Sequence, residues 1–209
     1  MSKNVKITWR GHSCFKIEDE GFSIIVDPYK DEKVPGLAPL RDKANRIMCS
    51  HDHDDHGCVD VIEYVETEQE MPFIVSLVAC PHDDEGGMKR GMNLIHIFSN
   101  DDLRIAHFGD IGCPLNEKQI ETIGKLDVAM VPVGGFYTME PDGIQEMLEQ
   151  LKPTVVIPMH YRTEEYGFPV IGTLDDFLKM RDDVVRYETN EIEITPDMAS
   201  QTAVLKYLG

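Results

Sequence analysis

The sequence predicts a mixed α/β (α+β) fold in which two β-sheets pack face to face and helices lie on the outside. Short β-rich segments broken by turns fill the first third of the chain, and strand-like segments alternate with helix-like segments after it. Segments in this order suit sheets that share one core. No repeat, low-complexity segment or linker interrupts the 209 residues, so we expect a single domain over residues 1–209.

Turn signals divide the N-terminal half into strands. Gly11 and Gly21 separate the first β-rich segments, and the Pro- and Gly-containing segment Asp31–Lys43 predicts a surface loop. A short helix is expected over Val59–Val65, because its apolar residues share one helical face. Pro81–Gly91 predicts a second, polar and glycine-rich loop. The expected strands are Val5–Trp9, Cys14–Glu18, Ser23–Val26, Ile47–Cys49, Phe73–Val78 (of a buried type), Leu94–Phe98 and Leu103–Ala106.

Helices and strands alternate in the C-terminal half. Asn116 is the predicted cap of a helix that ends near Lys125, because an Asn side chain accepts hydrogen bonds from the first turn. Pro141 opens a second helix that ends near Leu151, and a third is expected over Leu174–Met180. The expected strands are Val128–Val133, Val155–Pro158, Val184–Tyr187, Glu191–Ile194 and Thr202–Leu208.

The chain is strongly acidic, with 38 Asp and Glu against 20 Lys and Arg and a formal net charge of −18. Such a surface repels phosphate backbones, so long nucleic acids are not expected as partners, although a local basic pocket would still bind an anionic small molecule. No apolar run approaches the roughly 20 residues that span a bilayer. The N-terminal segment is too polar for a secretory signal, so we expect a cytoplasmic protein with no membrane partner.

The cysteines indicate reduced thiols in a reducing compartment. Their number is odd, and no CxxC motif occurs, which argues against a disulfide framework. Small buried thiols need no catalytic role. The five are Cys14, Cys49, Cys58, Cys80 and Cys113.

Seven of the eight histidines lie at predicted strand ends or in glycine-rich loops, where functional sites are usually built. His96 is the exception, since it falls inside a predicted strand, where solvent or a hydrogen-bonded core position explains it. The other seven are His12, His51, His53, His56, His82, His107 and His160.

The run His51-Asp52-His53-Asp54-Asp55-His56 carries the strongest chemical signal. A regular strand or helix cannot direct all of these imidazoles and carboxylates to one small ion, but a loop can present His51 and His53 to one metal and Asp55 with His56 to a second. Zn, Fe, Mn and Ni all accept such ligands. The alternative interpretation is an acidic, His-containing surface loop.

Three further motifs follow apolar strands: Pro81-His82-Asp83, Phe108-Gly109-Asp110-Ile111-Gly112 and Pro158-Met159-His160-Tyr161. Together with the histidine run, they make the chain resemble the metallo-β-lactamase superfamily over essentially its whole length. It is similar above all to the small single-domain branch that includes the ascorbate-phosphate lactonases. The motifs that suggest this branch are Trp9-x-Gly11-His12-Ser13-Cys14-Phe15, Ala106-His107-Phe108-Gly109-Asp110 and Val131-Pro132-Val133-Gly134-Gly135.

The resemblance implies a four-layer αββα sandwich with two divalent metal ions at one edge, Zn first and Mn, Fe or Ni as alternatives. The implied ligands are His51, His53 and His82 for the first metal, Asp55, His56 and His160 for the second, and Asp110 as the bridge between them. The chain departs from the superfamily pattern at Gly57, directly after the histidine run, because many members have this glycine one residue later. We expect that departure to alter the exit of the loop and not the ligands.

His82 and His107 compete for the last position in the first ligand set. His82 lies in a polar loop with Gly86 and Gly87, which can bend toward a metal. His107 continues a predicted strand, where side chains alternate between the two faces. We therefore predict that His82 is the ligand and that His107 supports a ligand or packs in the core.

Several residues near the expected site have two interpretations each. His12 is either a proton donor or substrate contact, or a structural hydrogen-bonding group. Asp27 either orients a ligand histidine or forms an Asp-Pro turn. The candidate substrate contacts, which are otherwise solvated surface groups, are Lys89, Arg90, Tyr137 and Arg162.

A site with two metals predicts hydrolysis. The metals lower the pKa of a shared water, and the resulting hydroxide attacks an acyl carbonyl or a phosphorus centre. The expected activity is hydrolysis of an ester, lactone, amide or phosphodiester bond in a small molecule, with Asp55, Asp110 and His12 as catalytic candidates. The alternatives are a nuclease or phosphodiesterase, a diiron redox enzyme, and a metal-binding or sensing protein without turnover. His53 stands where the redox chains have Glu, which argues against the diiron alternative.

Overall fold

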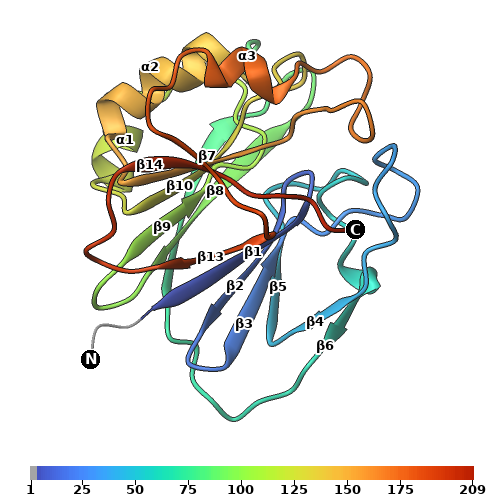
Figure 1. Cartoon of the computed structure of the whole chain (residues 1–209), viewed down its shortest axis with the longest axis vertical. Helices are drawn as coiled ribbons and strands as arrows, with labels where there is room; N and C mark the ends of the chain where they lie inside the picture. Colours follow the sequence, from blue (N-terminus) through green and yellow to red (C-terminus); the bar gives the residue numbers. More distant parts are fainter. Residues whose placement is uncertain (1–3) are drawn as a thin grey trace.

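Two β-sheets form the centre of the molecule in the computed structural model, which describes residues 4–209 (Figure 1). The first three residues, which begin the polar segment used above to argue against a secretory signal, lie outside the described residues. The strands are β1 (Val5–Gly11), β2 (Cys14–Asp19), β3 (Phe22–Val26), β4 (Asp42–Ala44), β5 (Arg46–Met48), β6 (Ile62–Tyr64), β7 (Ile74–Pro81), β8 (Met92–Ser99), β9 (Arg104–His107), β10 (Val128–Pro132), β11 (Val155–Met159), β12 (Val184–Arg186), β13 (Glu191–Ile194) and β14 (Gln201–Val204).

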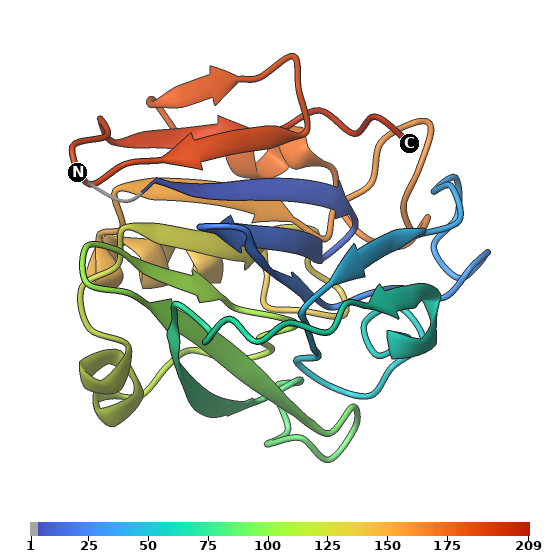
Figure 2. The ribbon, with the colours of Figure 1, turned by 90° about the horizontal axis from the view of Figure 1, so that it is seen from below.

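The two sheets pack against each other and confirm the predicted fold class. One sheet of five strands has the order β13-β1-β2-β3-β5, and the other, of seven strands, has the order β12-β14-β11-β10-β9-β8-β7. Seen from below, the blue strands β1 and β2 lie in front of the yellow and green strands of the larger sheet (Figure 2). The main core joins apolar side chains of both sheets, such as Phe15 and Phe98, with side chains of the helices, such as Phe177.

Three helices cover the outer face of the seven-stranded sheet: α1 (Glu117–Ile123), α2 (Pro141–Leu151) and α3 (Leu174–Leu178) (Figure 1). Asn116 caps α1 as predicted, because its side chain accepts a hydrogen bond from the backbone N–H of Gln119 at 3.0 Å. The predicted start of α2 at Pro141 is also confirmed. Among residues 4–209, no helix has both the length and the apolar character that crossing a membrane requires.

A loop and the two-stranded β4–β6 sheet, rather than helices, cover the outer face of the five-stranded sheet. Cys14 of β2 and Ile25 of β3 point to this face, because their neighbours Phe15 and Ile24 belong to the main core. They pack in a second, smaller core, whose other members are Tyr29, Val34, Leu40, Ala44 and Ile62.

Four sequence predictions differ from the structure. The helix expected over Val59–Val65 is wrong: Val59–Val61 forms one 3-10 turn, and β6 follows because Ile62–Tyr64 pairs with β4. β4 itself begins inside the loop predicted over Asp31–Lys43. β7 is not of a buried type, because it lies at the edge of its sheet and leaves Ile74 77% exposed. The last strand ends at Val204 and not at Leu208.

The topology brings the ends of six strands to one edge of the molecule. In the smaller sheet, β1, β3 and β5 run parallel to one another, because β1 and β3 each pair antiparallel with β2 and β5 pairs parallel with β3. In the larger sheet, β7 and β9 run parallel because each pairs antiparallel with β8, and β11 runs parallel to β9 because β10 pairs parallel with both. The segments that follow these strands therefore meet, and they carry the predicted site.

Candidate metal centre

Three site residues adopt a left-handed backbone conformation directly after a strand. His12 follows β1 with a φ of 51°, Asp27 follows β3 with a φ of 53°, and His160 follows β11 with a φ of 53°. Residues other than glycine rarely adopt such φ values, which cost on the order of 1–3 kcal/mol each and cluster at functional sites. The backbone N–H of His160 also donates to the His12 carbonyl at 3.3 Å, which links the two sheets at this edge.

A turn at the end of the histidine run directs its side chains to two sides. The backbone N–H groups of His56 and Gly57 both donate to the His53 carbonyl, at 2.9 and 2.7 Å. The Asp54 carbonyl accepts from the Lys30 N–H at 2.8 Å, which anchors the outer side of the turn to the loop after β3. This geometry separates His53 from His56 although only two residues lie between them.

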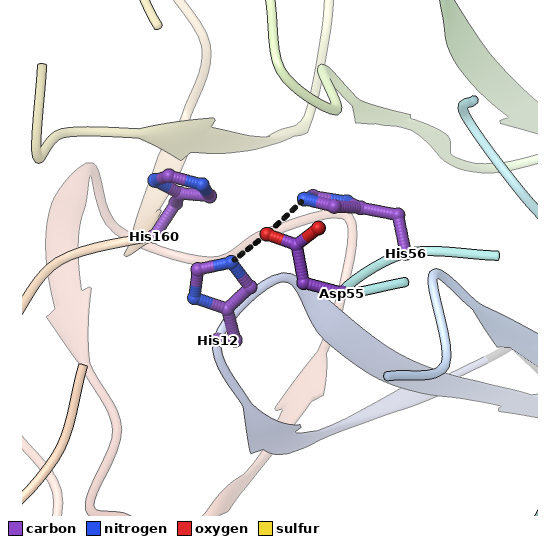
Figure 3. Close-up of side chains that lie close together, drawn as sticks. All are labelled: His12, Asp55, His56 and His160. Atoms are coloured by element: carbon purple, nitrogen blue, oxygen red, sulfur yellow. Dashed lines mark ion pairs between the residues drawn. The ribbon is translucent and has the colours of Figure 1, made fainter. Parts of the chain in front are cut away.

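The structure gathers the predicted residues into two sets of donor atoms. The first set consists of His51, His53 and His82, which come from the histidine run and from the end of β7. The second set consists of His12, Asp55, His56 and His160, which lie around one point (Figure 3). Within each set, the donor atoms lie within 4.8 Å of one another. These are the two triads that the resemblance implied, with His12 added to the second.

Asp110 lies between the two sets. Its Oδ2 is 3.4 Å from Nε2 of His82 in the first set, and 3.3 Å from Nε2 of both His56 and His160 in the second. Together with His51 and His56, Asp110 also forms a third group of close donor atoms. One carboxylate oxygen thus contacts histidines that come from three different segments of the chain.

The donor atoms that converge here fit divalent metal ions. The buried side-chain atoms without a hydrogen-bond partner among the described residues include Nε2 of His51, His56 and His160, and Oδ1 of Asp110. Unsatisfied polar atoms are costly in a protein interior, so native structures rarely leave several at one place. Imidazole nitrogen and carboxylate oxygen are the ligands of zinc and of other first-row divalent metals. The residues therefore suit the metals that the resemblance implies.

Asp27 fixes the orientation of two of these histidines. The carboxylate is fully buried, and its Oδ2 accepts from Nδ1 of His56 at 2.8 Å and from Oγ of Ser50 at 2.6 Å. Ser50 Oγ in turn lies 2.9 Å from Nδ1 of His51. With Nδ1 of each ring engaged in this way, both rings direct Nε2 into the site, which is the usual arrangement of ligand histidines. The geometry favours the orienting role of Asp27 over a simple turn.

Asn93 and Gly109 position the segment that carries Asp110. The buried Asn93 side chain accepts from the Asp110 N–H at 2.8 Å and donates to the Phe108 carbonyl at 2.9 Å. Gly109 has a φ of 54°, and a Cβ at this position would overlap Asn93 Oδ1 and lie 2.6 Å from Ser50 Cβ. Only glycine therefore lets this segment approach Ser50 so closely.

Burial and mutual contact set the charges of the site. Burial lowers the pKa of His51 to about 3 and that of His12 to about 4, so both rings are neutral electron-pair donors at neutral pH. Burial alone would also lower the pKa of His56, but the carboxylates of Asp110 and Asp27 raise it well above its ordinary value. The carboxylate of Asp27 keeps a pKa of about 2 in spite of burial, because His107 and His56 stabilise its charge. The centre thus favours a positive charge between its carboxylates.

A cavity of about 530 Å³ opens beside the two donor sets. Its size suits a small molecule. Tyr137 and Phe168, with ring centroids 6.0 Å apart, form its aromatic wall. The residues that line it are Lys33, Asp52, His53, Asp54, Asp55, His82, Arg90, Asp110, Tyr137 and Phe168.

The structure places His82, and not His107, beside His51 and His53. Both ring nitrogens of His107 are used elsewhere, because Nε2 donates to the Ser13 carbonyl at 2.8 Å and Nδ1 accepts from the Gly109 N–H at 3.2 Å. His96 is buried in the middle of β8. It belongs to neither donor set among the described residues.

The candidate substrate contacts divide into two groups. Arg90 and Tyr137 line the cavity beside the donor sets. The side chain of Arg162 donates to the Ile171 carbonyl at 2.7 Å, and Lys89 pairs with Glu85 at 2.7 Å, so both are engaged elsewhere. All five cysteines are free thiols, as predicted.

Comparison with known proteins identifies the family of the chain. The family profile described as the beta-lactamase superfamily domain matches residues 6–160. A UPF0173 metal-dependent hydrolase of Thermoplasma acidophilum is 29% identical over 193 residues, which cover 77% of this chain and 85% of that protein. The chain belongs to the metallo-β-lactamase superfamily.

Solved structures show the same fold. A Thermotoga maritima protein assigned to the Zn-dependent hydrolases of the metallo-beta-lactamase superfamily superposes with a TM-score of 0.75 and 30% identity, over 96% of this chain and 98% of that one. The isothiocyanate hydrolase from Delia radicum gut bacteria superposes with a TM-score of 0.63 over 84% of this chain and 91% of that one. At 14% identity, that second likeness concerns the fold alone.

Proposed function

We propose that this protein is a hydrolase that holds two divalent metal ions and cleaves an ester, lactone, amide or phosphodiester bond in a small molecule. The observation that carries the proposal is the position of Asp110 Oδ2, within 3.4 Å of histidines from both donor sets. The names of the relatives, which are metal-dependent hydrolases, support the same reaction class. Zinc is the metal that the donor set suits best, and Mn, Fe and Ni are alternatives.

The seven candidate ligands divide into three for each ion and one that bridges the pair. His51, His53 and His82 would hold the first ion, and Asp55, His56 and His160 would hold the second. Asp110 would bridge the pair and balance part of its charge, because two cations close together in a buried site need a shared anion. When bound, such a pair lowers the pKa of water and polarises the bond to be cleaved.

His12 is assigned to Asp55 rather than to the substrate. Its Nε2 lies 3.3 Å from Asp55 Oδ2, and its ring lies against that of His160, with centroids 4.1 Å apart and the planes tilted by 42° (Figure 3). His12 is buried and is not among the described residues that line the cavity. We therefore propose that His12 positions Asp55 within the second set, in place of the proton donation considered from the sequence.

The cavity restricts the substrate to small molecules. Its carboxylates and the net charge of −18 disfavour a long nucleic acid. Tyr137 and Phe168 offer an apolar surface to the part of a substrate that is not cleaved. The size and acidic lining of the cavity beside the donor sets thus support a small-molecule hydrolase over a nuclease.

The proposal is tested by removing and restoring the metal. Chelator-treated protein is assayed against panels of p-nitrophenyl esters, lactones and phosphodiesters, before and after addition of two equivalents of Zn²⁺ or Mn²⁺. We expect hydrolysis of at least one panel only after metal is added. Tight binding of metal without turnover on any panel would instead indicate a metal-binding or sensing protein.

A further inference from the structure

Arg90 is the cavity cation that remains available to a ligand. It is half-buried and lies at the end of the loop after His82, on the wall that it shares with Tyr137. The other cation that lines this cavity, Lys33, pairs with Asp54 at 3.3 Å. Among the described residues, the Arg90 guanidinium has no carboxylate within 4.0 Å and no hydrogen-bond acceptor. In a chain with 38 acidic and 20 basic residues, such a group inside a cavity is unusual.

Asp83 fixes the place of Arg90 without neutralising it. The buried Asp83 carboxylate accepts hydrogen bonds from the backbone N–H groups of Glu85, Gly87, Lys89 and Arg90, all at 2.8–2.9 Å. These four bonds use the lone pairs of the carboxylate and fold the loop around it. The loop therefore has a defined shape, and its anion faces the backbone and not the Arg90 side chain.

Tyr137 orients the guanidinium. The Arg90 Cζ lies 5.5 Å from the centre of the Tyr137 ring, in the range of a cation–π contact. A contact of this kind uses no N–H group of the guanidinium in a hydrogen bond, so these donors stay free for a ligand. A planar fork of N–H donors matches the two oxygens of a carboxylate or phosphate.

We propose that Arg90 binds an oxyanion of the substrate, so that the molecule cleaved at the metal centre is a small carboxylate or phosphate-bearing compound whose anionic group lies apart from the bond that breaks. The inference rests on the proposed function in one respect: the proposed metal centre sets where the cleaved bond lies. Arg90 and the donor residues His53, His82 and Asp110 line one cavity, so a single small molecule can contact both. Tyr137 and Phe168 form an uncharged wall, which suits the carbon skeleton between the anionic group of the substrate and the bond that is cleaved.

Lys89 provides a matched control. It carries the same charge on the neighbouring residue of the same loop, but its Nζ pairs with Glu85 at 2.7 Å and with Asp84 at 3.3 Å. It is not among the residues that line the cavity beside the donor sets. Lys89→Gln and Arg90→Gln therefore change the net charge equally, and both keep the backbone N–H groups that bind Asp83.

The test compares two substrates in the zinc-loaded protein. Mono-p-nitrophenyl succinate and its methyl ester share the leaving group and the acyl chain, and differ only in the distal carboxylate. We expect Arg90→Gln to lower the ratio of kcat/KM for the anionic ester to that for the neutral ester by about ten-fold or more, as loss of a charge-assisted hydrogen bond implies. Lys89→Gln should leave this ratio within about two-fold, because its charge is paired outside the cavity. An unchanged ratio in Arg90→Gln overturns the inference.

A binding measurement separates this inference from the proposed function. Isothermal titration of the zinc-loaded proteins with inorganic phosphate requires no turnover. We expect binding about ten-fold weaker in Arg90→Gln than in Lys89→Gln or the wild type. Equal affinities, or no affinity in the wild type, contradict an anion site at Arg90. If the wild type hydrolyses no ester, the ester part of the proposed function is wrong. The phosphate affinities of the variants then still decide whether Arg90 binds an anion.

Discussion

Replacement of Asp27 by Asn tests how the buried carboxylate prepares the metal ligands. Asn has the same shape as Asp and tolerates positive φ, so it suits the backbone φ of 53° at this position. If the Asn oxygen stays on the Ser50 N–H, which lies 2.6 Å from Asp27 Oδ1, its NH2 group faces Ser50 Oγ and His56 Nδ1. The variant therefore places a donor where the two side chains now find an acceptor.

The change reverses the proton positions on both histidines. His56 Nδ1 has to become an acceptor, which moves its proton to Nε2, the atom 3.3 Å from Asp110 Oδ2. Ser50 Oγ then accepts from the Asn NH2 and donates to His51 Nδ1, so His51 changes in the same way. Each ring would present a proton to the metal instead of a lone pair.

Loss of a hydrogen-bond partner behind a ligand costs roughly 10–100-fold in metal affinity, or about 1.4–2.7 kcal/mol. Because one histidine of each donor set is affected, we expect both metal affinities to fall, with a total effect near the upper end of this range.

Competitive titration with a chromophoric zinc chelator measures the two affinities. Ser50→Ala is the matched control, because it breaks the link to His51 and leaves the pair between His56 and Asp27. It should weaken mainly the first site, by about ten-fold. Thermal unfolding of the metal-free proteins shows whether each variant folds. If folded Asp27→Asn binds both zinc ions as tightly as the wild type, Asp27 does not set the protonation of the ligands and the reasoning is wrong.

Four further substitutions test other parts of the site. His82→Ala should lose the first metal, with a fall in affinity well beyond 100-fold, whereas His107→Ala should lose roughly 10–100-fold, and the reverse order in metal titrations would exchange the two roles. His12→Asn, which tolerates the positive φ, should weaken the second metal by about 10–100-fold while KM at saturating metal stays unchanged, and a raised KM with unchanged metal affinity would make His12 a substrate contact. Gly109→Ala should lower both Tm and metal content, because its Cβ overlaps Asn93 Oδ1, and a wild-type metal content would show that the segment relaxes freely.

The residues that the resemblance implied as ligands lie together in the structure, because they belong to segments that follow strands. Strand ends are readable from apolar segments and turn residues, and parallel strands bring their ends to one edge of a sheet. The position of the motifs at His82, Asp110 and His160 after strands could be predicted from the sequence, and the resemblance joined them to the histidine run. Their roles as ligands stay predictions until a metal is measured, as does the likeness to the ascorbate-phosphate lactonase branch.

Residues that act through distant contacts could not be predicted in this way. Ser50 meets Asp27 across 23 positions, and Asn93 meets Asp110 across 17. Neither has a motif of its own, because a single Ser or Asn beside a strand is common in any sequence. The available signals were the position of Ser50 next to His51 and that of Asn93 within β8, but neither position indicates a partner.

Predictions from the local sequence pattern were wrong where strand pairing determined the structure. The apolar residues of Val59–Val65 fit a helical face, yet Ile62–Tyr64 pairs with β4. β4 itself could not be predicted, because it begins in a segment whose composition is typical of a loop. The apolar composition of Phe73–Val78 indicates burial, but β7 is an edge strand and exposes Ile74. Both outcomes depend on which neighbour a strand acquires, and that is a tertiary property.

The metal content of the wild type and of Asp110→Ala tests the central claim most directly. Both proteins are loaded with zinc, freed of loosely bound metal and analysed by elemental mass spectrometry, and circular dichroism confirms that both are folded. We predict close to two zinc ions per chain in the wild type and one or fewer in the variant, because Asp110 contacts histidines of both sets. A wild-type content near zero, or two tightly held ions in Asp110→Ala, would contradict a centre built around that carboxylate.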